Sequence, residues 1–176
     1  TKTIVEALSL ISPGQQTCFL AFNKSIATEL KARVPSHVEA MTLNSLGHRA
    51  WTKFQGKFCQ LDANKTKLIV KEALTMDEQV NSSAIRQLVS LAKAHGLVPS
   101  EVRGATALMQ DTPDNWQGFV NRFDIDIEDG DVGGAIAAAR RVLVVSMSRR
   151  ELIDFDDQLF MTVALNVPVR RYDWLF

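Results

Sequence analysis

The sequence lacks the features that direct a protein to a membrane or out of the cell. Only two residues are cysteine, Cys18 and Cys59, and they have neither the spacing of metal ligands nor the pattern of a disulfide framework. No apolar run approaches the roughly 20 residues needed to span a bilayer, and no signal-peptide pattern is present. We therefore expect a cytoplasmic protein without membrane contact, in which both thiols lie in the core.

The sequence also lacks a net charge, because 20 Lys and Arg residues balance 20 Asp and Glu residues. Overall charge therefore gives no support for nucleic-acid binding, which would need a local cluster of suitable groups. The hydrophobic content of 46% is ordinary for a soluble globular protein. The 176 residues are enough for one good core or two small ones.

The most informative stretch is Thr17–Val34. Residues 17–22 form a short apolar run without a helical period, which predicts a buried strand, and from Ser25 the apolar residues fall at helical spacing. The hinge between them, residues 23–25, is the first candidate site, because ligands of open α/β sheets bind where strand carboxyl ends meet helix amino ends. An ordinary strand-to-helix turn is the alternative interpretation.

A second junction of this kind follows at residues 38–47. A short strand is expected over 38–43, and the polar residues after it open a helix that contains His48 and Trp51. Thr42 and Asn44 could be only helix-capping residues, and His48 only a surface or core-edge histidine.

The sequence pattern of residues 56–150 differs from that of the residues before them, since helical patterns joined by polar loops replace the short apolar runs. We expect an α/β fold in which residues 1–55 and 151–176 form one domain and residues 56–150 form an inserted all-helical subdomain. The expected helices cover 65–74, 84–95 (capped by Asn81-Ser82-Ser83), a segment capped by Asp114, 135–147, and a segment capped by Asp154.

Two sets of charged residues in these segments have competing interpretations. Asp154, Asp156 and Asp157 could form a metal or paired-carboxylate site, but capping of a helix start is favoured. The arginine pairs 140–141, 149–150 and 170–171 could follow a nucleic acid, although charged helix edges are usually only solvated.

Two segments resemble motifs of the UvrD/Rep-type superfamily 1 DNA helicases. Phe19–Leu30 resembles motif Ia, and Thr42–Arg49 resembles motif Ib, in which this chain has Asn44 where the family usually has histidine. Thr1-Lys2-Thr3 is similar to the tail of a Walker A loop, and Tyr172–Phe176 is similar to the lead-in to Walker B.

The resemblance implies an incomplete P-loop, RecA-like motor domain, cut after the Walker A lysine and before the Walker B Asp-Glu pair. It implies ATP and Mg²⁺ as cofactors of the intact protein, with Thr1 and Thr3 as cofactor-binding residues and Thr1 as a metal ligand. Single-stranded DNA and a second motor domain are the implied partners. The implied DNA-binding residues are Phe22, Asn23, Lys24, Thr42, Asn44, Ser45 and His48.

No catalytic residue falls within the chain under this resemblance. We therefore expect the intact protein to be a DNA-dependent ATPase and helicase, and the chain by itself to be inactive. Base stacking could come from Phe22 or Trp51, although either could equally be a core residue. Two other functions stay open: a non-catalytic nucleic-acid or protein interaction module that retains this architecture, and a metabolic α/β domain with a helical insertion.

Overall fold

The structure, a computed structural model, describes residues 2–128 and 130–176. The chain divides into two compact units, of which the first comprises the residues up to Ala50 together with Pro168–Phe176, and the second comprises Trp51–Val167. Helices combined with a small parallel sheet make the fold mixed α/β, as the sequence predicts.

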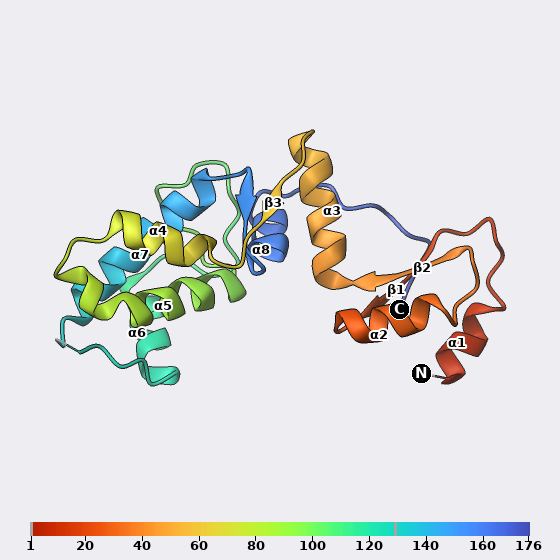
Figure 1. Ribbon diagram of the computed structural model, residues 1–176, viewed down its shortest axis with the longest axis horizontal. Helices are drawn as coiled ribbons and strands as arrows, with labels where there is room; N and C mark the ends of the chain where they lie inside the picture. The colour runs from red at the N-terminus through yellow and green to blue at the C-terminus, as the bar shows by residue number, and fades with distance from the viewer. Residues whose placement is uncertain (1, 129) are drawn as a thin grey trace. The chain divides into compact units, whose positions relative to one another are not determined.

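The first unit is built on a three-stranded parallel sheet with the strand order β2-β1-β5, of which Figure 1 labels β1 and β2. Its elements are α1 (Lys2–Leu8), β1 (Thr17–Ala21), α2 (Lys24–Lys31), β2 (Val38–Thr42) and β5 (Trp174–Leu175), and helix α3 (Leu43–Gln55) follows β2 directly. The predicted succession of strand, hinge and helix therefore occurs twice, in β1-α2 and in β2-α3.

The central strand β1 has a core on each of its faces. On one face Ala21 packs in a cluster with Ala27 and Leu30 of α2. On the other face Cys18 packs with Met41 and other apolar residues. Because both faces are covered, the strand reads as a continuous apolar run, which is the pattern that predicts it.

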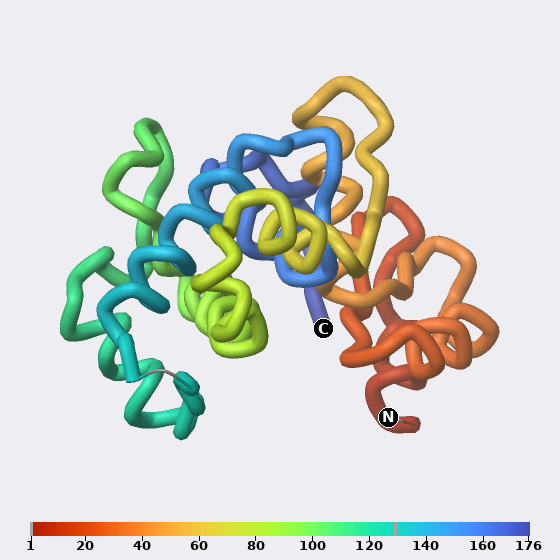
Figure 2. The backbone as a smooth tube through the Cα atoms, turned by 60° about the vertical axis from the view of Figure 1, so that its left-hand side comes forward, coloured from red at the N-terminus to blue at the C-terminus, as the bar shows by residue number. Residues whose placement is uncertain are grey.

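The second unit is mainly helical, and α7 packs against both α4 and α5 (Figure 2). Its elements after α3 are β3 (Gln60–Leu61), α4 (Lys65–Ala73), the 3₁₀ helix η1 (Glu78–Asn81), α5 (Ser82–Ala94), α6 (Pro113–Arg122), α7 (Val132–Ser148), β4 (Leu152–Ile153) and α8 (Asp157–Ala164). The predicted insertion is therefore not all-helical, because β3 and β4 form a short parallel pair. None of the helices in the described residues has the length and apolar character to cross a bilayer.

The helical unit is larger than the predicted insertion 56–150, since it also takes in residues 51–55 and 151–167. Trp51 is fully buried, and its indole N–H donates to a backbone carbonyl of the same unit at 3.1 Å. The carboxylate of Asp157, at the start of α8, is buried in an ion pair with a lysine of α4. These two contacts explain why both flanking segments pack with the helices.

Two helix starts differ from the expected ones. Helix α6 is capped by Thr112, whose hydroxyl accepts a hydrogen bond from the backbone N–H of Asn115 at 3.3 Å, so Asp114 is not the cap. The side chain of Asn81 makes no cap for α5 and instead accepts from the backbone N–H of Glu128 at 3.0 Å. At α6 a neighbouring residue therefore takes the capping role. At α5 the expected cap residue bonds to a backbone N–H far along the chain.

Both cysteines are free and buried, as expected. Burial raises the pKa of the Cys18 thiol and of the Cys59 thiol, so both stay protonated at neutral pH.

Candidate nucleic-acid interface

The carboxyl ends of β1 and β2 bring the two hinges to the same edge of the sheet. The strands pair in parallel, and their register ends with Ala21 opposite Thr42. The residues that follow each strand therefore leave the sheet side by side, and each runs directly into a helix. Because β1 and β2 pair in parallel, two segments about 20 positions apart in the chain lie next to each other.

The first hinge exposes an aromatic ring beside a helix cap. The side chain of Phe22 is 96% exposed, so it is not a core residue. Asn23 caps α2, because its side-chain oxygen accepts a hydrogen bond from the backbone N–H of Ile26 at 2.9 Å. This bond uses the amide oxygen and leaves the amide N–H groups available to an external acceptor.

Lys24 occupies an electrostatically unusual position. It is the first residue of α2, whose first turn contains no acidic side chain. The amino end of a helix carries a partial positive charge, so a cation there destabilises the helix and strengthens the local field for an anion. Within the described part of the chain Lys24 forms no ion pair.

The second hinge is more closely engaged with its own helix. The hydroxyl of Thr42 accepts a hydrogen bond from the backbone N–H of Ser45 at 3.1 Å, and the two hydroxyl oxygens are 2.9 Å apart. Thr42 therefore stabilises the start of α3, which is the capping role that the sequence left open. Asn44 and His48 are half-buried, and each already has an interaction partner, whereas Ser45 is exposed.

Other residues predicted to contact DNA or cofactors are placed differently. Trp51 is completely buried and cannot stack on a base. Thr3 is exposed in α1, and Thr1 lies outside the described residues. Among residues 2–128 and 130–176 no group of three or more His, Cys, Asp or Glu side chains could hold a metal ion. The described residues therefore do not test the predicted ATP and Mg²⁺ contacts.

The arginine pairs are largely neutralised by acidic partners. Arg140 pairs with Asp111 at 2.6 Å, and Arg170 pairs with Glu39. Arg141 and Arg149 likewise each have an acidic partner. These four guanidinium groups therefore serve the fold, which favours the structural interpretation of the pairs.

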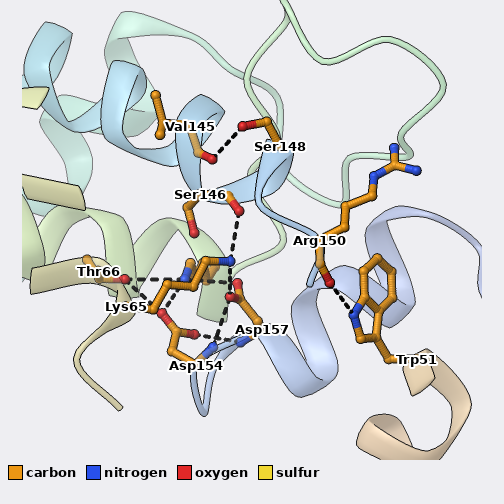
Figure 3. A network of polar contacts seen from close by, with 10 residues as sticks. Trp51, Lys65, Thr66, Val145, Ser146, Ser148, Arg150, Asp154 and Asp157 are labelled. Atoms are coloured by element: carbon orange, nitrogen blue, oxygen red, sulfur yellow. Dashed lines mark hydrogen bonds and ion pairs between the residues drawn. The ribbon is translucent and has the colours of Figure 1, made fainter. Parts of the chain in front are cut away.

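Two lysines that the sequence does not single out, Lys65 and Lys93, form a buried ionic cluster with Asp154 and Asp157 in the helical unit (Figure 3). Lys65 Nζ lies 2.7 Å from Asp157 Oδ2, and Lys93 Nζ lies 2.6 Å from Asp154 Oδ2 and 2.9 Å from Asp157 Oδ1. The hydroxyl of Thr66 donates to Asp154 at 2.7 Å. Two cations and two anions thus share one dry site, and their charges cancel.

Burial and pairing have opposing effects on this cluster. Burial lowers the pKa of Lys65. Burial would raise the pKa of Asp154, but the charge and hydrogen bond of Lys93 outweigh it and hold that pKa below its ordinary value. Burial likewise opposes protonation of Lys93, but Asp157 and Asp154 outweigh it and raise the pKa of the lysine. The group fits a structural role, since every charge has a partner.

The N-cap residue of α8 is Asp156, whose side chain makes no cap bond, and Asp154 instead bonds to the first backbone N–H of the helix. The carboxylate of Asp154 accepts from the backbone N–H of Asp157 at 2.9 Å, and the carboxylate of Asp157 accepts from the backbone N–H of Asp154 at 3.1 Å. The third acid, Asp156, accepts a hydrogen bond from the hydroxyl of Ser90 at 2.8 Å.

Comparison with known proteins adds no relative, since neither a protein-family model nor a curated protein matches the chain.

Proposed function

We propose that the chain is part of an ATP-dependent DNA helicase or translocase, in which single-stranded DNA crosses the edge where β1 and β2 end. The observation that supports the proposal is the parallel pairing that places both hinge motifs at that edge. A parallel sheet with helices is compatible with the RecA-like, P-loop domain that the motif resemblance implies.

The exposed groups at this edge suit a single strand that is bound without reading its sequence. The ring of Phe22 offers a face on which a base can stack, and Lys24 offers a cation for a backbone phosphate. The amide N–H groups of Asn23 and the hydroxyl of Ser45 can donate to phosphate oxygens. Thr42 contributes by fixing the start of α3.

ATP and Mg²⁺ enter the proposal only through the intact protein. When bound there, they would supply the energy of phosphoryl transfer, and a second motor domain would complete the site. Of the two residues that the resemblance assigns to the cofactors, only Thr3 is described, and its side chain is exposed. The chain by itself is expected not to hydrolyse ATP.

DNA binding by the chain can be tested by fluorescence anisotropy with a labelled oligothymidylate over a range of salt concentrations. Phe22→Ala should weaken binding by about 1–3 kcal/mol, the usual contribution of one stacked base. Lys24→Glu should weaken binding and reduce the slope of log affinity against log salt by about 0.7 or more, because at least one phosphate contact is lost.

The matched control is Lys31→Glu, at the opposite end of the same helix. It changes the net charge equally, but it should leave the affinity within about twofold if the contact is local. Lys24→Glu should also stabilise α2 by about 0.3–1 kcal/mol, so weaker binding cannot be attributed to unfolding. Equal losses for the two lysine variants, or no binding at low salt, would contradict the proposed DNA path.

The ATPase part of the proposal has a separate test in the reading frame that encodes the intact protein. We expect Gly-x-Gly-Lys immediately before Thr1 and an Asp-Glu pair immediately after Phe176. If DNA binds and these residues are missing from the frame, the non-catalytic interaction module becomes the better function.

A further inference from the structure

An open groove lies in the helical unit, whereas the candidate DNA interface belongs to the first unit. It has two adjoining compartments of about 790 and 240 Å³, which share Asn64, Lys67 and Arg86 as lining residues. Helices α4 and α5 pack against each other and supply half of the remaining lining. The groove therefore belongs to one compact unit.

Three cations converge on the larger compartment. Lys67 and Lys71 lie one turn apart on α4, and Arg86 comes from α5. In residues 2–128 and 130–176 none of the three forms an ion pair, and Arg86 donates only to the backbone carbonyl of Ser82, at 3.2 Å. Elsewhere in this unit Arg140, Arg141 and Arg149 have acidic partners, whereas here three cations without such partners line one compartment.

The rest of the lining is apolar or hydrogen-bonding. Leu68, which is exposed, provides an aliphatic surface in the larger compartment, which the buried Val70 also lines. Gln79 and Asn64 provide amide groups. Among the described residues no aromatic side chain lines this larger compartment, and Phe155 lines the smaller one. A ligand with carboxylates on either side of an aliphatic group would match both the charges and the apolar surface.

Three carboxylates also line the groove, and two of them restrict what can bind, because the third, Asp154, is already paired with Lys93. Asp62 accepts from the backbone N–H of Asn64 at 2.8 Å, in the larger compartment, and Asp156 accepts from Ser90 at 2.8 Å, in the smaller one. A phosphodiester chain carries a negative charge at every nucleotide and would meet both carboxylates, and it would find no stacking surface in the larger compartment. A peptide can place neutral residues opposite them.

We propose that this groove is a docking site for an acidic peptide segment of a partner protein, with glutamates or aspartates that flank an aliphatic residue. The acidic side chains pair with Lys67, Lys71 and Arg86, and the aliphatic residue covers Leu68. This inference is independent of the proposed DNA path, which uses the other unit.

The probe for this site is a short fluorescein-labelled synthetic peptide in which glutamates flank leucines, compared with the same peptide carrying glutamines. Binding to the whole chain is followed by anisotropy. The glutamate peptide should bind at least about tenfold tighter than the glutamine peptide, and the double variant Lys67→Glu with Lys71→Glu should remove this difference. Both lysines are exposed and unpaired, so circular dichroism should show an unchanged fold.

Arg103→Glu provides the control, since Arg103 is an exposed cation of the same unit outside the groove. It should leave peptide binding unchanged. Equal affinity for the two peptides, or an equal loss in Arg103→Glu, would overturn the proposal. The proposal would also be overturned if an unlabelled oligothymidylate displaced the labelled peptide more effectively than the unlabelled glutamate peptide does, and if this displacement required Lys67 and Lys71. The groove would then bind nucleic acid.

Discussion

Removing a single charge from the buried ionic cluster should destabilise the helical unit strongly. Asp157→Asn keeps the shape of the side chain but removes one of the two anions that balance Lys65 and Lys93. The side chains of Lys65 and Asp157 are 0% exposed, so water cannot take the place of the lost partner. One uncompensated positive charge then remains in a dry site.

The expected loss follows from the geometry. Breaking a buried pair by removing one partner usually costs about 3–5 kcal/mol. The amide oxygen of the new asparagine can keep one hydrogen bond from Lys65 Nζ, which lies 2.7 Å from Oδ2 in the native cluster. Its NH2 group then faces Lys93 Nζ, which lies 2.9 Å from Oδ1, and two donors cannot bond to each other, so we expect a value near the upper limit. The neighbouring change Asp156→Asn should cost less than about 1 kcal/mol, since its hydrogen bond from Ser90 survives in the amide.

Urea unfolding followed by circular dichroism measures both variants. A third variant, Lys65→Met with Asp157→Leu, removes one cation and one anion together, and it should recover most of the loss if the uncompensated charge is the cause. If Asp157→Asn lies within about 1 kcal/mol of Asp156→Asn, the cluster is not the dry, paired site described above.

Two further predictions concern acid stability and a tight turn. Burial would raise the pKa of Asp111, but hydrogen bonds from Arg140 and other donors outweigh it and hold that pKa below its ordinary value of 3.8. The stability that Asp111 contributes is therefore full above this value and is lost as the pH falls through the lower pKa of the folded state. Between about pH 5 and pH 2, Asp111→Asn should lose less stability than the native chain in chemical denaturation. An equal loss in the two proteins would contradict this prediction. Gly96 and Gly56 both have positive φ (+67° and +65°), but only at Gly96 would an added Cβ lie 2.8 Å from the Cβ of Leu108. Alanine at position 96 should therefore cost roughly 1–3 kcal/mol more than alanine at position 56 in thermal denaturation, and equal costs would show that Leu108 moves aside freely.

The parts of the fold that the sequence predicted depend on short-range patterns. A strand, a hinge and a helix within residues 17–34 are specified by an apolar run, a cap and a change of period, all of which act over a few positions. The cap is an example, since Asn23 bonds to a backbone N–H three residues later. The element types within residues 17–34 were therefore predictable, and so was the order of the two hinges, whereas the strands β3 and β4 were not predicted.

The parts that were missed depend on contacts between distant positions. Lys65 and Asp157 are 92 residues apart, and Lys93 and Asp154 are 61 apart. Lysines are rarely buried, and nothing in the residues around these two distinguishes them from surface lysines. The same contacts hold residues 151–167 in the helical unit. The boundary predicted from the local sequence pattern, after residue 150, could not take these contacts into account.

Lys24 and Phe22 are the residues on which the DNA proposal depends most. Capping alone accounts for Asn23 and Thr42, so their presence would be expected in any protein with these helix starts. Stability does not account for a cation in the first turn of α2, nor for a phenylalanine that is 96% exposed. Places where a sequence breaks a local rule without a structural gain are where function is expected. Here two such places are nearly adjacent, at the edge of the sheet where both hinges meet.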